Sequence, residues 1–357
     1  MDTETKVDLI KSFAEEIITE DELRKLFETN SRPIAYDGFE PSGKIHIAQG
    51  ILRAINVNKM TKAGCKFKML VADWHAWANN KVGGDLEKIQ IVGKYFIELW
   101  KQTGMDTRNV EFVWASDYIN DNNYLKTLMQ IARNSTVNRI LRCSQIMGRS
   151  ESDSLQASQI FYPVMQCADI FQLKVDICQL GMDQRKVNVL AREIGPKIGF
   201  YAPVAVHHHM LMGLGEPPKV DGTTEKAIAM KMSKSNPDSA IFMQDSEEEI
   251  KRKISKAYCP AKIVEDNPIL EYCNYIIFEK VNKLKIERDK KFGGDLVVKD
   301  YKELAKIYSK GEVHPTDLKN SVAKELNDLI KPVREHFEKN KKAKELYETV
   351  KKFDITR

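Results

Sequence analysis

Between about residue 32 and residue 214, short apolar runs alternate with longer amphipathic stretches, and this alternation constrains the fold more than any other feature. The apolar runs predict strands at RPIAYDGF, FKMLVADWHAW, VEFVWASD, KVDICQL and VAVHHHMLMGL. Residues with helical spacing lie between them, at 44–64, 85–104, 122–147, 158–173 and 183–195. Asp85 is a candidate N-cap, and Gly64 a helix stop. Strands that alternate with helices predict βαβ units and a parallel sheet.

The two ends of the chain have a different pattern. Residues 1–30 are expected to form helices, in VDLIKSFAEEIIT and EDELRKLFET. After Ser239 nearly every segment has helical spacing, and FGGD at 292–295 predicts a turn or short hairpin. A chain of 357 residues is long for a single core. We therefore expect an α/β domain with a Rossmann-like, doubly wound parallel sheet over residues 1–240, and a mainly helical domain over residues 241–357.

Composition excludes several classes of protein. Hydrophobic residues make up 42% and charged residues 30%, as in ordinary globular proteins. The sequence has no apolar run of membrane-spanning length and begins with the polar MDTETKVDLI, so we expect neither a membrane partner nor a secretory leader. The six cysteines contain no C-x-x-C pair, which argues against a zinc knuckle or dithiol site and favours the reducing cytoplasm. The net charge of +5, mostly in the last third, fits a phosphate-backbone partner and a solvated helical surface equally well.

The stretch YDGFEPSGKIHIAQG, residues 36–50, joins the end of a predicted strand to the start of a predicted helix. Gly43 would let the backbone approach a ligand closely. We expect unpaired N–H groups at the helix start to favour phosphate, with His46 in the first turn as a further donor. The spacing matches neither a Walker A loop nor a dinucleotide fingerprint. The stretch therefore indicates a nucleotide cradle, or alternatively a capped helix with a surface histidine.

MKMSKSNPDSA, residues 230–240, is a second polar stretch. Lys231 and Lys234 flank Met232 and Ser233. Two ammonium groups on one loop can stabilise negative charge that develops on phosphates. A lysine-rich loop of this kind can also be ordinary solvated surface.

Together, these two stretches in a parallel α/β domain resemble the signature motifs of class I aminoacyl-tRNA synthetases. His46–Gln49 (HIAQ) stands where that class has HIGH, with Ala and Gln at the third and fourth positions, and residues 231–235 match KMSKS in full. Three further features closely resemble those of archaeal and eukaryotic tyrosyl-tRNA synthetases: Tyr36, YPVMQCAD at 162–169 and GMDQRK at 181–186. The similarity runs from about Arg32 to Phe337. Two alternatives stay open: a tryptophanyl-tRNA synthetase, and a catalytically silent paralogue that binds tRNA or a protein.

The resemblance implies roles for the matching residues. Tyr36 and Asp169 would bind the phenol of substrate tyrosine, and a carboxylate there rejects phenylalanine, which would leave it unpaired. The amino and carboxylate end would contact Tyr162, Gln166 and Gln184. ATP would contact Gly43, His46, Gln49, Gly181 and Asp183, with Lys231, Met232 and Lys234 on the pyrophosphate side. Catalysis would rest on His46, Gln49, Lys231 and Lys234. Glu40 and Asp73 are further candidates at the same strand ends.

The family's partners are implied in the same way. ATP would carry Mg²⁺ on its phosphates, with no protein-held metal. His314 and Asp317 in HPTDLKN would contact the anticodon of tRNA(Tyr), although HPTD also reads as a helix N-cap box. Arg133, Arg139 and Arg142 are expected on one basic helix that faces the acceptor stem. The family resemblance also implies a cytoplasmic homodimer.

Two further patterns are expected to be structural. The run HHH at 207–209 resembles a metal site, but adjacent residues of a strand point to alternate sides and no carboxylate or cysteine is suitably spaced. The aromatic run WHAW at 74–77 is expected to pack in the core or at a dimer surface rather than bind bases.

Overall fold

The computed structural model describes residues 1–147, 154–218, 230, 232 and 236–353. Six strands form one sheet in the order β1-β6-β5-β2-β3-β4. Their bounds are β1 Ala14–Ile18, β2 Ile34–Phe39, β3 Lys66–Val71, β4 Val110–Trp114, β5 Ile177–Gly181 and β6 Val204–His208. β1 pairs antiparallel to β6, and the other neighbours are parallel. The predicted α/β fold with a doubly wound, mostly parallel sheet is confirmed.

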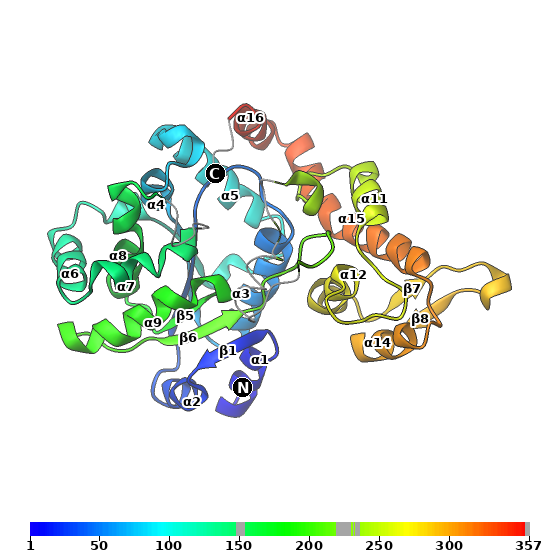
Figure 1. Ribbon diagram of the computed structural model, residues 1–357, viewed down its shortest axis with the longest axis horizontal. Helices are drawn as coiled ribbons and strands as arrows, with labels where there is room; N and C mark the ends of the chain where they lie inside the picture. Colours follow the sequence, from blue (N-terminus) through cyan, green and yellow to red (C-terminus); the bar gives the residue numbers. More distant parts are fainter. Residues whose placement is uncertain (148–153, 219–229, 231, 233–235, 354–357) are drawn as a thin grey trace.

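Helices cover both faces of the sheet. Because both faces of the central strands are therefore buried, the sequences of these strands are nearly unbroken apolar runs. Every residue of β5 is buried. One buried cluster joins the sheet to α3 (Arg53–Lys62) and α5 (Leu86–Trp100). A second joins the opposite face to α6 (Asn122–Arg133), α8 (Ala157–Gln172) and α9 (Arg185–Ile194) (Figure 1). Neighbouring residues of β2 separate accordingly: Ala35 belongs to the first cluster and Tyr36 to the second.

The strand order places a topological switch beside β2. The chain runs from β2 outward to β3 and β4, and then returns to the other side of β2 to form β5 and β6. β2 and β5 are paired in parallel, with Tyr36 opposite Cys178. Ligands of doubly wound sheets bind beyond the carboxyl ends of the strands at such a switch. A ligand site is therefore expected among the residues that follow β2 and β5.

The N-terminal segment departs from the prediction. Helices α1 (Thr3–Lys11) and α2 (Glu20–Thr29) are present, but AEEII between them forms β1 rather than helix. The residues have helical spacing, yet they pair with the edge of β6, which would otherwise be open. The pairing joins segments far apart in the sequence, so a local pattern does not reveal it.

Three further boundaries refine the predicted elements. The strand predicted through WHAW ends at Val71, and α4 (Asp73–Ala78) follows. The region predicted as one long helix at 122–147 divides into α6, α7 (Val137–Leu141) and the 3₁₀ turn Ser144–Met147. The helix predicted from residue 44 begins at Ala48 as a π turn, Ala48–Leu52, that continues into α3.

Two predicted boundary signals are confirmed. The side chain of Asp85 caps α5 by accepting a hydrogen bond from the N–H of Lys88. Gly64 follows the end of α3 with φ of +103°, a left-handed conformation that favours glycine.

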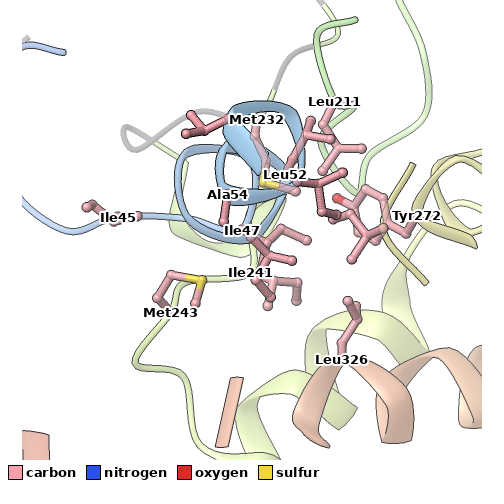
Figure 2. Packing of buried hydrophobic residues seen from close by; sticks show 14 of the residues in the cluster. Ile45, Ile47, Leu52, Ala54, Leu211, Met232, Ile241, Met243, Tyr272 and Leu326 are labelled. Carbon is pink, nitrogen blue, oxygen red and sulfur yellow. The ribbon is translucent and has the colours of Figure 1, made fainter. Parts of the chain in front are cut away.

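The C-terminal part is mainly helical. It contains α11 (Glu247–Lys256), α12 (Pro268–Tyr272), the π turn Cys273–Ile277, α13 (Phe278–Lys280), α14 (Tyr301–Ser309), α15 (Pro315–Lys339) and α16 (Lys341–Val350). The hairpin predicted at FGGD is confirmed: β7 (Leu284–Ile286) and β8 (Leu296–Val298) are antiparallel, with Gly293 and Gly294 at positive φ between them. α16 packs on α5, and one buried cluster extends from the sheet to Leu326 of α15 (Figure 2). No helix among the described residues is long and apolar enough to cross a membrane.

Candidate active site

A cavity of about 310 Å³ opens at the carboxyl ends of β2, β5 and β6. Its walls come from the segment after β2, from α8, from the GMDQ segment after β5 and from the residues after β6. The structure brings together in this pocket most of the residues singled out from the sequence: Tyr36, Glu40, His46, Gln49, Tyr162, Gln166, Asp169, Gly181, Asp183, Gln184 and Met232. A partly enclosed pocket with polar side chains in its wall therefore lies where the fold predicts a ligand.

Asp169 forms the buried end of this pocket. Its Oδ1 accepts hydrogen bonds from the hydroxyls of Tyr118 and Tyr124, both at 2.9 Å. Its Oδ2 lies 2.9 Å from Nε2 of His75 on α4. A carboxylate offers about four acceptor positions. Two buried hydroxyl donors and the nearby His75 ring thus fix Asp169. Its Oδ2, which has no hydrogen-bond partner among the described residues, can accept from a further donor.

The pKa of His75 lies above its usual value in this arrangement. Burial lowers the pKa of His75, but the charge and hydrogen bond of Asp169 outweigh it, and the net shift is upward. The His75 ring also contacts the Tyr162 ring edge to face, with centroids 5.1 Å apart. His75, Tyr118 and Tyr124 were not predicted from the sequence, because each resembles an ordinary core aromatic or histidine.

Tyr36 lies on β2 near the same end of the pocket. Its side chain is fully buried, and its hydroxyl has no hydrogen-bond partner among the described residues. Burial raises the pKa of Tyr36 well above its usual value, and the charge of Asp169 contributes to the shift. A buried hydroxyl without a partner is costly. The combination of this hydroxyl and Asp169 suits a ligand that both donates and accepts a hydrogen bond.

Amide and hydroxyl side chains line the wall nearer the opening. Gln166 Nε2 donates to Gln184 Oε1 at 3.1 Å, and Gln184 Nε2 donates to the Ile146 carbonyl at 3.2 Å. Burial raises the pKa of Tyr162, and the nearby carboxylate of Glu40 adds to this. Tyr162, Gln166 and Asp169 lie on one face of α8, as their spacing of four and three residues implies.

Gly181 ends β5 at a point where little space remains. A Cβ atom added there would lie 2.4 Å from Sδ of Met210 and 2.8 Å from Oδ1 of Asp183. Any larger residue would displace these two pocket residues. The glycine thus allows the end of β6 and the GMDQ segment to meet beside the cavity.

The stretch predicted as a nucleotide cradle has a different local geometry. Gly43 is buried with φ of +116°, and it shapes the turn after β2 without lining the pocket. His46 precedes the helix rather than lying in its first turn, and it forms a backbone bridge with Phe242. The N–H groups of Ile47 and Gln49 already donate to carbonyls of Ile241 and His46. Fewer backbone N–H groups are therefore available for phosphate than the sequence predicted. The side chains of His46 and Gln49 line the pocket.

A buried cation lies behind this cradle. Arg53, the first residue of α3, is 1% exposed and lies 3.0 Å from Oδ2 of Asp37. Its guanidinium also contacts Gln179 and lies 2.8 Å from a ring nitrogen of His208. Burial raises the pKa of Asp37 to about 6 against the opposing effect of Arg53. The pocket wall thus contains a fixed ion pair between Arg53 and Asp37. Neither residue was predicted from the sequence to belong to the site.

The remaining candidates differ in their relation to the pocket. Asp73 does not line it: its Oδ2 accepts from Ser116 Oγ at 2.6 Å and from Gln90 Nε2 at 3.1 Å, which ties neighbouring elements together. Glu40 does line it and accepts from Asn79 Nδ2 at 2.9 Å. Lys231 and Lys234 lie outside the described residues. Met232 between them in the sequence is 4% exposed and lines the pocket.

The candidates for tRNA contact lie elsewhere. His314 is the N-cap of α15 and its Nδ1 accepts from the N–H of Thr316, while Asp317 is in the first helical turn. The cap geometry predicted as the alternative is present. The three arginines do not share one helix, because residues 134–136 interrupt it: Arg133 ends α6, whereas Arg139 and Arg142 belong to α7 and its C-cap.

The exposed aromatic residue Phe292 was not singled out from the sequence. Phe292, between β7 and β8, is 64% exposed, and the Nζ of Lys291 lies 4.9 Å from its ring centroid. Arg288 donates to the carbonyls of Gly294 and Glu312. This bridge holds the Phe292 loop beside the segment that leads to His314.

The two patterns expected to be structural have protein partners. His207 bonds Glu16 and Asn188, His208 contacts Arg53, and His209 lies between Glu15 and Glu271. In the described part of the chain, no group of three or more His, Cys, Asp or Glu residues is arranged to hold a metal. Trp74 and Trp77 contact each other edge to face, and Trp77 remains 45% exposed.

Comparisons with known proteins identify relatives that match the whole length of the chain. Residues 28–331 match the family model described as tRNA synthetases class I (W and Y). The chain is 50% identical, over its whole length and 90% of the relative, to tyrosine–tRNA ligase 1, cytoplasmic, of Arabidopsis thaliana. It is 51% identical to tyrosine–tRNA ligase 2, cytoplasmic, of the same plant, of which it spans only 46%. The crystal structure of tyrosyl-tRNA synthetase from Pyrococcus horikoshii, complexed with L-tyrosine, superposes with a TM-score of 0.90 at 40% identity, covering 98% of this chain and 100% of that one.

Proposed function

The chain belongs to the class I tyrosyl-tRNA synthetases of archaeal and eukaryotic type, which are tyrosine–tRNA ligases, and we propose how its own residues carry out that reaction. The tyrosine carboxylate attacks the α-phosphate of ATP, forming tyrosyl-adenylate and releasing pyrophosphate. A ribose hydroxyl of the 3′-terminal adenosine of tRNA then takes the tyrosyl group and AMP leaves. Neither step needs a nucleophile from the protein. Catalysis comes from alignment and from stabilisation of phosphate charge.

The observation that carries the substrate assignment is the paired polar end of the pocket. The substrate phenol donates to Asp169 and accepts from the hydroxyl of Tyr36, which has no partner within the described chain. Tyr118 and Tyr124 already donate to Oδ1 of Asp169, and the His75 ring lies 2.9 Å from Oδ2, so the carboxylate is fixed in place and Oδ2 can accept from one more donor. Phenylalanine would leave both groups unpaired. An indole would supply one N–H and nothing for Tyr36, which disfavours tryptophan.

The amino and carboxylate end of tyrosine lies toward the pocket opening. Tyr162, Gln166 and Gln184 supply its hydrogen bonds. The Gln166–Gln184 hydrogen bond shows that the two amides are within reach of one small group. A bound α-amino group would replace part of this bond.

The nucleotide lies along the ends of β5 and β6 and the HIAQ segment. Asp183 binds the ribose, and Gly181 keeps the strand end open. His46 and Gln49 contact the phosphate and adenine side. Lys231 and Lys234 bind pyrophosphate, and the position of Met232 in the pocket wall supports this. ATP enters as its Mg²⁺ complex, with the ion on the phosphates.

A charging assay tests this proposal. With tRNA(Tyr) and ATP, the protein is expected to attach tyrosine, but not tryptophan or phenylalanine, to the tRNA 3′ end. Folded protein that binds tRNA(Tyr) but neither activates nor transfers any amino acid would instead support the silent paralogue.

The anticodon contact is proposed at the β7–β8 loop and the start of α15. His314 and Asp317 supply polar contacts, and the exposed ring of Phe292 supplies a surface on which a base stacks. Stacking of one base contributes about 1–3 kcal/mol. Phe292→Ala is therefore expected to raise the KM for tRNA in aminoacylation by about 5- to 150-fold, while tyrosine-dependent pyrophosphate exchange without tRNA stays unchanged. Val297→Ala, at an exposed apolar residue of β8, is the control and should match wild type.

A homodimer is proposed through the surface of α6, α7 and α8. Leu125 and Met129 on α6, Val137 on α7 and Phe161 on α8 are each at least half exposed, on helices that pack together (Figure 1). Large exposed apolar side chains gathered on adjacent helices indicate a contact surface. Sedimentation is expected to give twice the chain mass of 40.9 kDa for wild type and one chain mass for Met129→Glu. Ile263→Glu, which also replaces an exposed apolar residue, should stay dimeric.

The proposed compartment is the cytoplasm, which is the compartment in the names of both Arabidopsis relatives. The six free cysteines suit a reducing environment. Fractionation of cells that express the tagged chain would place it with cytosolic or with organellar markers.

A further inference from the structure

The segment His209–Leu214 connects the active-site pocket to the helical part of the chain. It follows β6 directly, and His209, Met210 and Leu211 line the pocket together with Met232. Met210 also abuts Gly181 at the end of β5. This wall therefore lies on the side of the pocket to which the nucleotide is assigned.

One edge of the segment bonds to the chain around Met232. The N–H of Met232 donates to the Leu211 carbonyl at 3.1 Å. The N–H of Gly213 donates to the carbonyl of Met230 at 2.7 Å. Leu211 and Gly213 thus hold residues 230 and 232 beside the pocket.

The other edge of the segment bonds to α12. Met212 lies between Leu211 and Gly213. Its backbone N–H and its carbonyl each form a hydrogen bond with one of two consecutive residues of that helix. The N–H of Met212 donates to Oε1 of Glu271 at 2.6 Å. The hydroxyl of Tyr272 donates to the Met212 carbonyl at 2.7 Å. In an extended segment alternate residues bond to opposite edges, so α12 fixes the same backbone that holds residues 230 and 232.

Glu271 has a second contact with the pocket wall. Its Oε1 lies 3.1 Å from Nε2 of His209, and Glu15 lies 3.4 Å from the other ring nitrogen. The His209 ring stacks on Tyr275, with centroids 4.3 Å apart and planes at 7°. Burial lowers the pKa of His209, but the two carboxylates outweigh this and raise it to about 9. A charged His209 is therefore fixed between the two carboxylates.

Tyr272 also contributes packing. It is fully buried and shares one apolar cluster with Leu211, Met232 and Leu52 (Figure 2). Figure 2 shows its ring beside Leu211, above Leu326 of α15. Neither Glu271 nor Tyr272 lines the pocket, so both residues act on it through the segment after β6.

We propose that Glu271 and Tyr272 are positioning residues for the activation step: α12 sets the pocket wall formed by His209, Met210, Leu211 and Met232, and thereby the binding of ATP. The inference rests on the proposed placement of ATP along this wall. It gives the helical part of the chain a role in amino-acid activation, a step that involves no tRNA.

The test is steady-state pyrophosphate exchange without tRNA, with ATP and tyrosine varied separately. Tyr272→Phe removes one hydrogen bond and keeps the ring, and Glu271→Ala removes both contacts of the carboxylate. Each is expected to raise the KM for ATP about 3- to 10-fold, the change produced by losing a hydrogen bond of typical net strength. The KM for tyrosine should stay within about twofold of wild type, because the phenol and amide contacts are untouched.

Matched variants separate positioning from loss of stability. Glu271→Gln keeps an acceptor for the Met212 N–H and should lie between wild type and Glu271→Ala. Tyr308→Phe removes the hydroxyl of another fully buried tyrosine, which donates to the Pro260 carbonyl within the helical part, and it should leave both KM values unchanged. Glu271→Gln also carries the test if Tyr272→Phe does not fold.

Two results would overturn the inference: folded Tyr272→Phe and Glu271→Ala with wild-type KM for ATP, or equal rises in the KM for ATP and for tyrosine. Absence of tyrosine-dependent exchange in the wild type is a separate result. It would contradict the proposed function itself.

Discussion

Asp169→Ala is expected to lower kcat/KM for tyrosine in pyrophosphate exchange by at least about 100-fold. A hydrogen bond to a charged partner is worth about 1.5–3 kcal/mol, and the variant also releases the side chains that Asp169 holds in place. The hydroxyls of Tyr118 and Tyr124 both donate to Asp169, and His75 lies 2.9 Å from it. These buried donors would lose their common acceptor. ATP binding, measured by equilibrium titration, should change little, because the nucleotide is proposed to bind at residues other than Asp169 and the groups that hold it.

Two variants calibrate this result. Asp169→Asn keeps the side-chain volume and one acceptor oxygen, so it tests the role of the Asp169 carboxylate if the alanine variant is poorly folded. It should still lose most activity, because its NH2 group would face the donors that Asp169 accepts from. Tyr36→Phe removes a hydroxyl that has no partner in the described chain, so it should weaken tyrosine binding about tenfold without destabilising the fold. A folded Asp169→Ala protein with normal tyrosine activation would refute the role given to Asp169.

Arg53→Met is expected to lower the free energy of unfolding by about 3–5 kcal/mol, the usual cost of removing one partner of a buried ion pair. Arg53 and Asp37 are 1% and 4% exposed, and their charged atoms are 3.0 Å apart. Methionine fills much of the volume, but it leaves the carboxylate of Asp37 buried without a cation. Urea denaturation at pH 7.5 measures the loss.

The pH dependence of Arg53→Met identifies the cause. Burial already raises the pKa of Asp37 to about 6 in the presence of Arg53, and the loss of that cation should raise it further. In the unfolded chain an aspartate has a pKa of about 3.9 and has already released its proton, whereas Asp37 in the folded state still binds one. Stability therefore falls as pH rises through this window. The variant should therefore be more stable at pH 5 than at pH 8, by a wider margin than wild type. Adding Asp37→Asn should remove that extra dependence and restore part of the stability; an unchanged pH profile would contradict this explanation.

The sheet could be predicted because its central strands are buried on both faces. β2, β3 and β5 consist of apolar runs between helices whose periodicity is clear, and a parallel sheet follows from that alternation. β1 could not be predicted in the same way. AEEII has an ambiguous local pattern, and its strand conformation depends on pairing with β6 about 190 residues later.

The pocket was predictable where its residues are close in sequence. Tyr162, Gln166 and Asp169 share a helix face by spacing alone, and all three line the cavity. The residues that hold Asp169 come instead from α4, from the turn after β4 and from α6, so only the fold brings them together. Arg53 was hidden for another reason. A single arginine in an amphipathic helix normally reads as surface, and its burial depends on Asp37, Gln179 and His208 from three different strands.

The most direct test of the account is ATP–pyrophosphate exchange measured with each of the twenty amino acids in turn. The Asp169 and Tyr36 end of the pocket predicts exchange with tyrosine and none above background with phenylalanine or tryptophan. Exchange that phenylalanine or tryptophan supports as well as tyrosine does would contradict the phenol site on which the account rests.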